Sequence, residues 1–397
     1  MTVTLKIEKN VYGGDGLGRL GDGRVVFVPG AFAGETVRAE LTEQKKNFVR
    51  ARCAEILERS PDRVDPGPTV PGMVYAGVNY AAELRHKQDQ LGNFLGKIGL
   101  SYAHVEVVAG RSEHYRNKAV YHVRRAGGKW IMGYLREQSH DVVDVTADPL
   151  ACEEINRALP QIRAGVFALL TQGAKNVRRS AAEAETVTVR FTPVDGVKWW
   201  LGDAPAGMSL TEQTAGLKFK VAADGFYQVN PKVGDELVKA VRADYLAGAD
   251  NARNLADLYC GVGVFGLACA KADPSGLGRL VGVESVKSAV AFAKENAASL
   301  GVRANFFCER VGGNLKRIKV GAHTSVIVDP PRGGMEKGVP EWLAASSAPR
   351  IFCVSCDPAT LVRDLAPIVK NYRVSRVKLF DMFPRTARFE TLVELEK

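Results

Sequence analysis

The spacing of apolar and polar residues divides the chain into three stretches with different expected structures. Residues 1–60 contain short apolar runs such as Val25–Val28, separated by glycine turns at Tyr12–Gly18 and Gly21–Gly23. Short runs bounded by glycine predict β-strands. The pattern is typical of a small barrel of the OB type, and many such barrels bind oligonucleotides. A barrel with a purely structural role fits the same pattern.

The middle of the chain follows a segment rich in proline and glycine, Asp62–Gly77, which predicts a linker or loop. From about residue 78 to 100 the apolar spacing is helical. From 105 to 220 it is mostly strand-like, with one helix near 150–172. We therefore expect an α+β central domain.

From Gly225 the chain alternates between strand and helix patterns. The predicted strands cover 254–259, a run ending at 282–284, 325–329, 351–355, 373–380 and 389–395, and the predicted helices cover 264–271 and 286–299. This alternation predicts an α/β fold with a doubly wound sheet. The predicted domains are 1–60, 61–224 and 225–397.

The composition and charge of the chain narrow the classes of partner that it could bind. The chain has 397 residues, 46% of them apolar, so packed cores are expected and overall disorder is not. The net charge of +10 favours an anionic partner such as RNA or DNA, although it could serve solubility alone. Residues 83–137 contain ten lysines or arginines and only five acids, and this local excess of positive charge favours a phosphate-binding surface.

The sequence also bears on the cellular compartment. Polar residues follow Met1 where a signal peptide would be apolar, and no apolar stretch approaches the ~20 residues of a membrane span. The seven cysteines are scattered without a disulfide framework. We expect a cytoplasmic protein, free of membrane contact and monomeric, whose thiols stay reduced.

Candidate chemistry gathers at the predicted carboxyl ends of strands, where ligands bind in open α/β sheets. Gly261 and Gly263 form a turn that lets a ligand approach the backbone, although several nucleotide cofactors use such turns. Glu284 ends the next strand and could hold ribose hydroxyls, or could be a surface or capping residue. Asp329 precedes two prolines that fix a rigid turn, which could also be only structural.

The strongest single signal is Cys356, which stands where a strand ends and a helix begins near Ala359. That position presents the thiol to a cleft, and a helix N-terminus favours its thiolate. Cys353 lies inside the apolar strand and is expected to be a core residue. Taken alone, Cys356 could equally be an inert buried cysteine.

Ordered motifs along the whole chain resemble the uracil-C5 RNA methyltransferases that begin with a TRAM domain. The matching segments are Tyr12–Gly16, Val26–Gly30, Tyr115–Lys118, Ser139–Val145, Phe226–Asn230, Ser355–Pro358, Asp381–Pro384 and Phe389–Thr391. The resemblance implies a TRAM barrel of the OB type, a central RNA-binding α+β domain, and a class I methyltransferase domain that uses S-adenosylmethionine.

The resemblance also implies the roles of particular residues. Cys356 corresponds to the nucleophile, with Asp357 in place of the usual asparagine, and Glu390 corresponds to the general base. The implied cofactor contacts are Gln228, Tyr259, Gly261, Gly263, Glu284 and Asp329. A thiolate that adds to carbon 6 of uracil makes carbon 5 nucleophilic, and a base must later remove the carbon-5 proton. The target uridine must be flipped out of its stack.

The sequence departs from the family pattern in two respects. Many relatives bind a [4Fe–4S] cluster through three cysteines after the TRAM domain and a fourth further on. Residues 62–100 contain no cysteine, and Cys152 matches the fourth ligand alone. Because a cluster needs about four thiolates, we predict no iron–sulfur cluster and no metal. Val264 stands where relatives often have a polar residue able to contact the cofactor, and Arg310 follows Glu309 at a position where an amide or acid is usual.

Two alternatives stay open from the sequence. The target could be another atom, such as carbon 5 of cytosine, or the chain could be an inactive RNA-binding or folding factor. The intact Cys356 and Glu390 favour the uracil-C5 enzyme. For the substrate, the TRAM domain favours 23S ribosomal RNA over transfer RNA.

Overall fold

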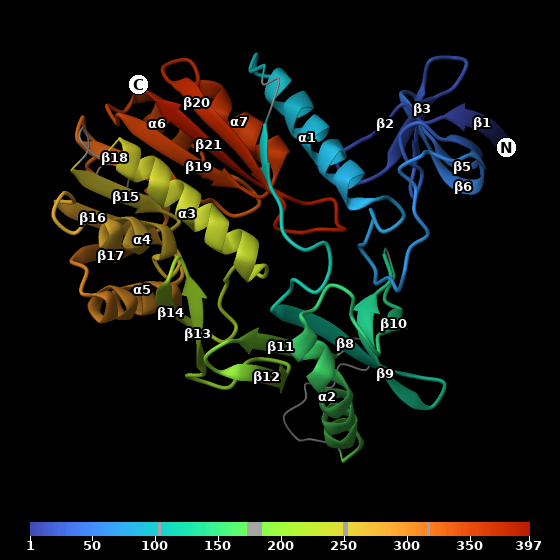
Figure 1. Cartoon of the computed structure of the whole chain (residues 1–397), viewed down its shortest axis with the longest axis horizontal. Helices are drawn as coiled ribbons and strands as arrows, with labels where there is room; N and C mark the ends of the chain where they lie inside the picture. The colour runs from blue at the N-terminus through green and yellow to red at the C-terminus, as the bar shows by residue number, and fades with distance from the viewer. Residues whose placement is uncertain (102–104, 138, 173–184, 249–252, 314, 316–317) are drawn as a thin grey trace.

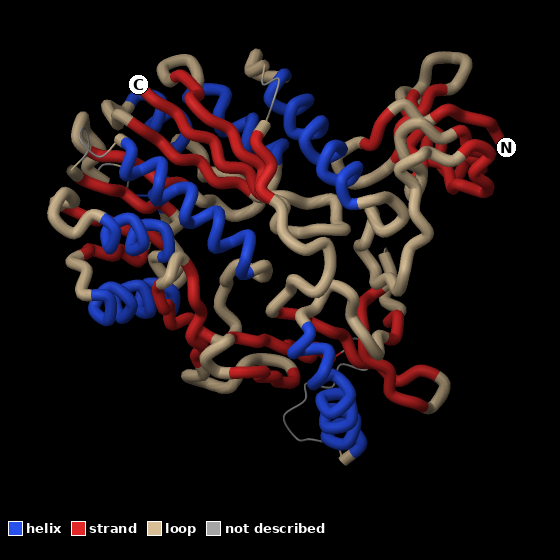
Figure 2. The backbone as a smooth tube through the Cα atoms, viewed as in Figure 1, coloured by secondary structure: helices blue, strands red, loops and turns tan. Residues whose placement is uncertain are grey.

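The structure is a computed structural model that describes residues 1–101, 105–137, 139–172, 185–248, 253–313, 315 and 318–397. An amino-terminal barrel, a central sheet with one long helix, and a large carboxyl-terminal sheet lie around a middle region of loops (Figures 1 and 2). Within the described ranges, no helix has both the length and the apolar character needed to cross a membrane.

The amino-terminal strands form a six-stranded sheet in the order β1-β5-β6-β4-β3-β2. Its strands are β1 (Thr2–Lys6), β2 (Lys9–Asn10), β3 (Gly16–Arg19), β4 (Val25–Val28), β5 (Thr36–Gln44) and β6 (Phe48–Glu58). Side chains alternate along β4, so Val26 and Val28 are buried while Val25 and Phe27 are half-buried. The strand β1 also packs against β3, which closes the sheet into a barrel.

The central region is an antiparallel five-stranded sheet in the order β10-β9-β8-β11-β12, covered on one face by α2. Its elements are β8 (Lys118–Ala126), β9 (Lys129–Leu135), β10 (Val142–Asp144), α2 (Glu153–Thr171), β11 (Glu185–Thr192) and β12 (Gly196–Leu201). Ile155, Leu159, Ile162 and Val166 form one stripe of α2 and are buried against the sheet.

The carboxyl-terminal sheet has eight strands in the order β17-β16-β15-β18-β19-β21-β20-β7. They are β7 (Glu106–Val108), β15 (Asn254–Leu258), β16 (Arg279–Glu284), β17 (Ala304–Cys308), β18 (Thr324–Val328), β19 (Arg350–Ser355), β20 (Arg373–Phe380) and β21 (Glu390–Glu396). The strands from β17 to β19 run parallel, and β21 runs antiparallel to β19.

Helices cover both faces of this sheet. One face carries α3 (Pro231–Ala247), α4 (Val264–Ala272) and α5 (Lys287–Leu300), and the other carries α1 (Tyr80–Gly96), α6 (Val339–Ala345) and α7 (Pro358–Ile368). This is the doubly wound α/β fold that the sequence predicted. The helices α3 and α6 and the strand β17 were not predicted.

Three segments that precede Gly225 pack with the carboxyl-terminal sheet or its helices. The strand β7 pairs with β20, and α1 packs against α7. The hairpin of β13 (Ser209–Thr214) and β14 (Leu217–Ala222) packs on α5, where the Asn296 side chain bonds both the N–H and the carbonyl oxygen of Lys220. The domain boundaries at residues 60 and 224 remain a prediction.

Candidate active site at the carboxyl edge of the sheet

Five of the candidate residues lie in a row along one edge of the large sheet. Glu284, Tyr259, Asp329 and Cys356 stand at or just beyond the carboxyl ends of β16, β15, β18 and β19. Leu258 pairs with Val328, and Val328 with Cys353, so these strand ends are neighbours. Glu390 starts the antiparallel β21 beside the end of β19, where Ser355 pairs with Thr391, so it joins the same edge.

Cys356 lies between the last buried residue of β19 and the first turn of α7, and its side chain is half-buried. Burial, followed by the nearby carboxylates of Glu390 and Asp329, raises the pKa of the Cys356 thiol to about 12. The pKa of the thiol is therefore raised, whereas its position at a helix N-terminus led us to expect a lowered pKa. The expectation was wrong for the ligand-free protein because burial and two acidic neighbours outweigh the backbone.

Glu390 and Asp329 are the acids beside the thiol. Glu390 is 4% exposed, and its burial, together with the charge of Asp329, raises its pKa well above the ordinary glutamate value. Burial also raises the pKa of Asp329 to about 7. Such shifts are common where protons are transferred. A cation bound beside this thiol and these two acids would favour their ionised forms.

The turn after β15 supplies the backbone of a nucleotide site. Tyr259, Gly261 and Gly263 have φ values of 62°, 53° and 85°, in the left-handed region that favours glycine. The space beside Gly261 is open, and its N–H donates to Glu284 at 3.1 Å. The other oxygen of Glu284 accepts from the N–H of Val286 at 2.7 Å.

These groups fit S-adenosylmethionine. Glu284 also accepts from the Ser285 hydroxyl at 3.1 Å. A carboxylate accepts about four hydrogen bonds, so Glu284 retains capacity for about one ribose hydroxyl. The left-handed turn brings backbone close to a ligand, at the start of α4. The acids along the edge match the positive charge of a sulfonium.

Gln228 lies apart from the row, in the segment before α3. Gln228 packs closely on Gly234 of α3: a Cβ atom added at Gly234 would lie only 3.0 Å from the Cβ atom of Gln228. Two neighbours anchor this segment: the side-chain amide of Asn230 donates to the Met382 carbonyl at 3.3 Å, and the Val229 carbonyl accepts from the Asn117 N–H at 2.9 Å. The segment that carries Gln228 is thus held in part by the loop 381–389, which leads to Glu390.

The two residues that depart from the family pattern, Val264 and Arg310, are linked to the turn of residues 259–263. Val264 begins α4 and packs half-buried against the core. Arg310 pairs with Glu336 at 3.5 Å, and the N–H of Glu336 donates to the Tyr259 hydroxyl at 3.1 Å. Arg310 is therefore linked to a cofactor-turn residue through Glu336.

Asp257 lies in β15 two residues before Tyr259 and was not among the predicted cofactor contacts. It is fully buried, and one oxygen accepts from the Gly266 N–H at 2.8 Å while the other has no hydrogen-bond partner within the described residues. Burial raises its pKa to about 7. An acid inside an apolar strand is the sequence signal that could have identified it.

The loop before Glu390 is anchored by buried charges that sequence reasoning missed. Lys87 of α1 is fully buried and donates to Glu83 and Asp381, both at 2.7 Å, and the Tyr80 hydroxyl donates to Asp381 at 2.8 Å. The Tyr115 hydroxyl donates to the Pro384 carbonyl at 3.0 Å. Helix α1 and the central domain thus hold the segment that carries the candidate base.

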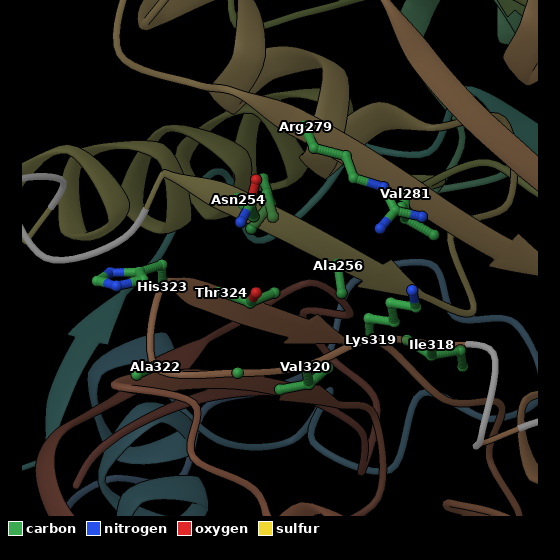
Figure 3. A pocket seen from close by; sticks show the side chains of 12 residues that line it. Asn254, Ala256, Arg279, Val281, Ile318, Lys319, Val320, Ala322, His323 and Thr324 are labelled. Carbon is green, nitrogen blue, oxygen red and sulfur yellow. The ribbon is translucent and has the colours of Figure 1, made fainter.

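A separate hollow of about 380 Å³ lies at the opposite, amino-terminal edge of the strands (Figure 3). Asn254, Arg279, His323 and Thr324 line it from the starts of β15, β16 and β18, and Lys319 lines it from the preceding loop. Ligands of open α/β sheets bind at the carboxyl edge, so this hollow is not the cofactor site.

The residues present do not fit an iron–sulfur cluster. Cys152 precedes α2 and packs in the apolar cluster that includes Val70 and Met73. The described part of the chain holds no group of three or more His, Cys, Asp or Glu side chains placed to bind a metal. The absence of a cluster remains a prediction for iron analysis.

The fold and the edge residues together define a methyltransferase of the class I, S-adenosylmethionine-dependent type. Family models match residues 207–397, described as tRNA (Uracil-5-)-methyltransferase, and residues 1–54, described as TRAM domain. An uncharacterized RNA methyltransferase of Thermosynechococcus vestitus is 30% identical over 99% of this chain and 98% of that protein.

Two further proteins bear on the substrate and the fold. The 23S rRNA (uracil(1939)-C(5))-methyltransferase RlmD of Shewanella amazonensis is 30% identical over 99% of this chain and 95% of that protein. The Pyrococcus abyssi tRNA (uracil-54, C5)-methyltransferase, solved with S-adenosyl-L-homocysteine, has a TM-score of 0.75 at 21% identity, covering 98% of this chain and 100% of that one. The chain belongs to the TRAM-containing RNA (uracil-5-)-methyltransferase family, and it is an S-adenosylmethionine-dependent enzyme that acts on RNA.

Proposed function

We propose that this enzyme methylates carbon 5 of a uridine in 23S ribosomal RNA, with Cys356 as nucleophile and Glu390 as general base. The observation that carries the proposal is that Cys356, Glu390 and Asp329 lie together at one edge of the sheet. All three have raised pKa values, and the two acids contribute to the raised pKa of the thiol. We also propose that it acts as a monomer in a compartment where Cys356 stays reduced.

The cofactor is held by the row of residues along the edge. Glu284 accepts a hydrogen bond from a ribose hydroxyl, and the Gly261 and Gly263 turn lets the backbone come close. Tyr259, Asp329 and Gln228 complete the site. When bound, S-adenosylmethionine supplies the methyl group that carbon 5 accepts.

The residues of the chain carry the remaining steps. The thiol of Cys356 loses its proton to solvent, and the thiolate sulfur forms a bond to carbon 6 of the uracil. The electron pair of the carbon 5–carbon 6 double bond moves toward the carbonyl at carbon 4, giving an enolate with nucleophilic density at carbon 5. Addition of the thiolate is required because uracil carbon 5 is otherwise a weak nucleophile.

Release of the product falls to Glu390. Its carboxylate takes the proton from the methylated carbon 5, the carbon 5–carbon 6 double bond re-forms, and the carbon–sulfur bond breaks to restore the Cys356 thiolate. Glu390 then loses the proton to solvent. A raised pKa makes this carboxylate a stronger base once it is ionised.

Electrostatics could link cofactor binding to thiolate formation. Burial and two acids raise the pKa of Cys356. A bound sulfonium near these groups would favour the ionised forms of Cys356, Asp329 and Glu390 and would lower their pKa values.

A basic hollow beside the Gln228 segment gives the RNA a path to the site. It measures about 300 Å³ and is lined by Arg116, Lys118 and Tyr134 of the central domain together with Phe226 and Val229. Phe226 is 76% exposed. Exposed aromatic rings stack on unpaired bases, and cations bind the adjoining phosphates.

The choice of ribosomal RNA rests on the relatives. Curated relatives that match nearly the full length of the chain include enzymes named for 23S rRNA. The solved structure named for transfer RNA is only 21% identical and supports the fold.

The experiment is a map of 5-methyluridine in ribosomal and transfer RNA from cells with and without the gene, restored with wild type, Cys356→Ala or Cys353→Ala. We expect one ribosomal uridine to lose its methyl group, with rescue by wild type and by Cys353→Ala but not by Cys356→Ala. Loss of a methyl group from transfer RNA instead would refute the ribosomal assignment. Rescue by Cys356→Ala would remove Cys356 from the mechanism.

A further inference from the structure

We propose that Tyr12 of the amino-terminal barrel is a positioning residue that holds Asp357 and Phe389, the chain neighbours of Cys356 and Glu390. The inference rests on the proposed roles of Cys356 and Glu390. It makes the docking of the barrel a determinant of the geometry of the catalytic pair, in addition to any role of the barrel in RNA binding.

One side chain contacts both neighbours. The Tyr12 hydroxyl donates to Asp357 Oδ2 at 3.4 Å, although the two residues are 345 positions apart in the sequence. The Tyr12 ring meets the Phe389 ring edge-on, with centroids 6.0 Å apart and planes at 79°. A second edge-on contact, to Phe94 of α1 at 5.7 Å, holds the ring from the other side.

The two oxygens of Asp357 have different partners. Oδ1 accepts from the N–H groups of Ala359 and Thr360, at 3.0 and 3.1 Å, and so caps α7 directly after Cys356. Oδ2 faces the Tyr12 hydroxyl and lies 3.9 Å from Arg332 Nε. An aspartate suits this position because both groups that face Oδ2 favour an acceptor with negative charge.

The barrel loop that carries Tyr12 is itself fixed to α1. The amide of Gln90 donates to the carbonyls of Asn10 and Val11, at 3.2 and 3.1 Å, and to the Tyr75 hydroxyl at 2.8 Å. Gly14, two residues beyond Tyr12, has a φ of 97° and lies close against Val74. The position of Tyr12 is therefore set by packing on both sides of the loop.

Tyr12 stays a hydrogen-bond donor under ordinary conditions. Burial and the charge of Asp357 raise the pKa of its hydroxyl to about 12. The hydroxyl is protonated at neutral pH and stabilises the Asp357 carboxylate, which in turn caps the helix that presents Cys356.

The test compares Tyr12→Phe, which removes only the hydroxyl, with Tyr12→Ala, which also removes the ring contacts. Tyr372→Phe is the matched control, because its buried hydroxyl bonds Ser346 and Ala348 at the opposite edge of the sheet. Three quantities are measured on the full chain: amide exchange in residues 355–361 and 389–391, RNA affinity, and the single-turnover methylation rate. The RNA is saturating ribosomal RNA from cells that lack the gene.

We expect Tyr12→Phe to speed exchange in residues 355–361 and to slow single-turnover methylation about tenfold, with RNA affinity and melting temperature unchanged. Tyr12→Ala should extend the faster exchange to residues 389–391. Tyr372→Phe should change neither region nor the rate.

Unchanged exchange in both Tyr12 variants would overturn the proposal, as would a loss of RNA affinity with normal turnover at saturating RNA, which would make Tyr12 an RNA contact. If wild type fails to methylate this RNA, the proposed substrate is wrong, and the exchange of residues 355–361 still decides whether Tyr12 holds the Asp357 segment.

Discussion

At the scale of residues, the chemistry of the site follows from burial acting on acids and a thiol that share one edge. Cys356, Glu390 and Asp329 each have a raised pKa, and for each the largest cause is removal from water. Such groups are less ionised than they would be in water, and a cation beside them would favour their ionised forms. The site thus favours reaction in the presence of the sulfonium cofactor over reaction in its absence.

The raised pKa of Cys356 predicts its reactivity. Only the thiolate reacts with iodoacetamide, so the alkylation rate of Cys356 in the ligand-free protein should rise about tenfold per pH unit from 7 to 10, without a plateau near 9. Asp329→Asn removes one negative neighbour, so it should lower this pKa and speed alkylation roughly tenfold at pH 8.

Peptide mass spectrometry separates Cys356 from the other cysteines and gives each rate. Asp203→Asn, an exposed acid of the central domain, serves as the control and should leave the rate unchanged. A plateau at or below pH 9 would contradict the electrostatic account of the thiol.

Sequence reasoning identified these residues because strand ends and short motifs are local features. Cys356 and Asp329 each follow an apolar strand, and that pattern is visible without a structure. Asp257 and Tyr12 were not identified as site residues, because their roles depend on burial and on a contact spanning 345 positions. The predicted direction of the Cys356 pKa shift was also wrong, because only the fold brings Glu390 and Asp329 beside the thiol.

At the scale of elements, α1 joins the amino-terminal barrel to the loop before Glu390. Lys87 forms ion pairs with both Glu83 and Asp381 in a fully buried network, and Gln90 holds the barrel loop. Removing one member of such a network leaves charge buried without a partner, which costs far more than the pair contributes.

Lys87→Met should therefore lower the free energy of unfolding by about 3–5 kcal/mol. Burial raises the pKa of Glu83 to about 7, above its unfolded value, so its ionised form destabilises the fold as the pH rises. The deficit should accordingly be smaller at pH 5 than at pH 8. Urea unfolding at both pH values measures it.

Lys294→Met, an exposed lysine of α5, is the control and should change stability by less than about 0.5 kcal/mol. Equal effects of the two substitutions would show that the buried network does not stabilise the loop before Glu390.

The elements that sequence reasoning missed have identifiable causes. The helix α3 begins with Asn230 as cap and Pro231 in its first turn, and its buried residues Val233, Leu237 and Val241 follow helical spacing, so the signal was present and was overlooked. The strand β7 lies within the stretch 105–220 that the sequence predicts to be mostly strand, but its pairing with β20, about 270 positions later, is not visible in any local pattern.

At the scale of the whole molecule, apolar side chains surround Cys152, the cysteine that the family resemblance matched to a cluster ligand. Cys152 packs with Val70 and Met73 in an apolar cluster. Purified protein, prepared without oxygen, should therefore contain no stoichiometric iron or sulfide. Iron analysis and the visible absorption spectrum measure this, and a broad band with about four irons per chain would contradict it.

The central claim is that Cys356 and Glu390 share one catalytic cycle, and Glu390→Gln tests it most directly. The amide cannot accept the carbon-5 proton, so addition and methylation should proceed while elimination stalls. With S-adenosylmethionine and ribosomal RNA from cells that lack the gene, we predict an adduct that survives denaturing electrophoresis, with methylated uridine attached to Cys356. Only free RNA at every time point, from a folded variant that still binds the cofactor, would contradict the account.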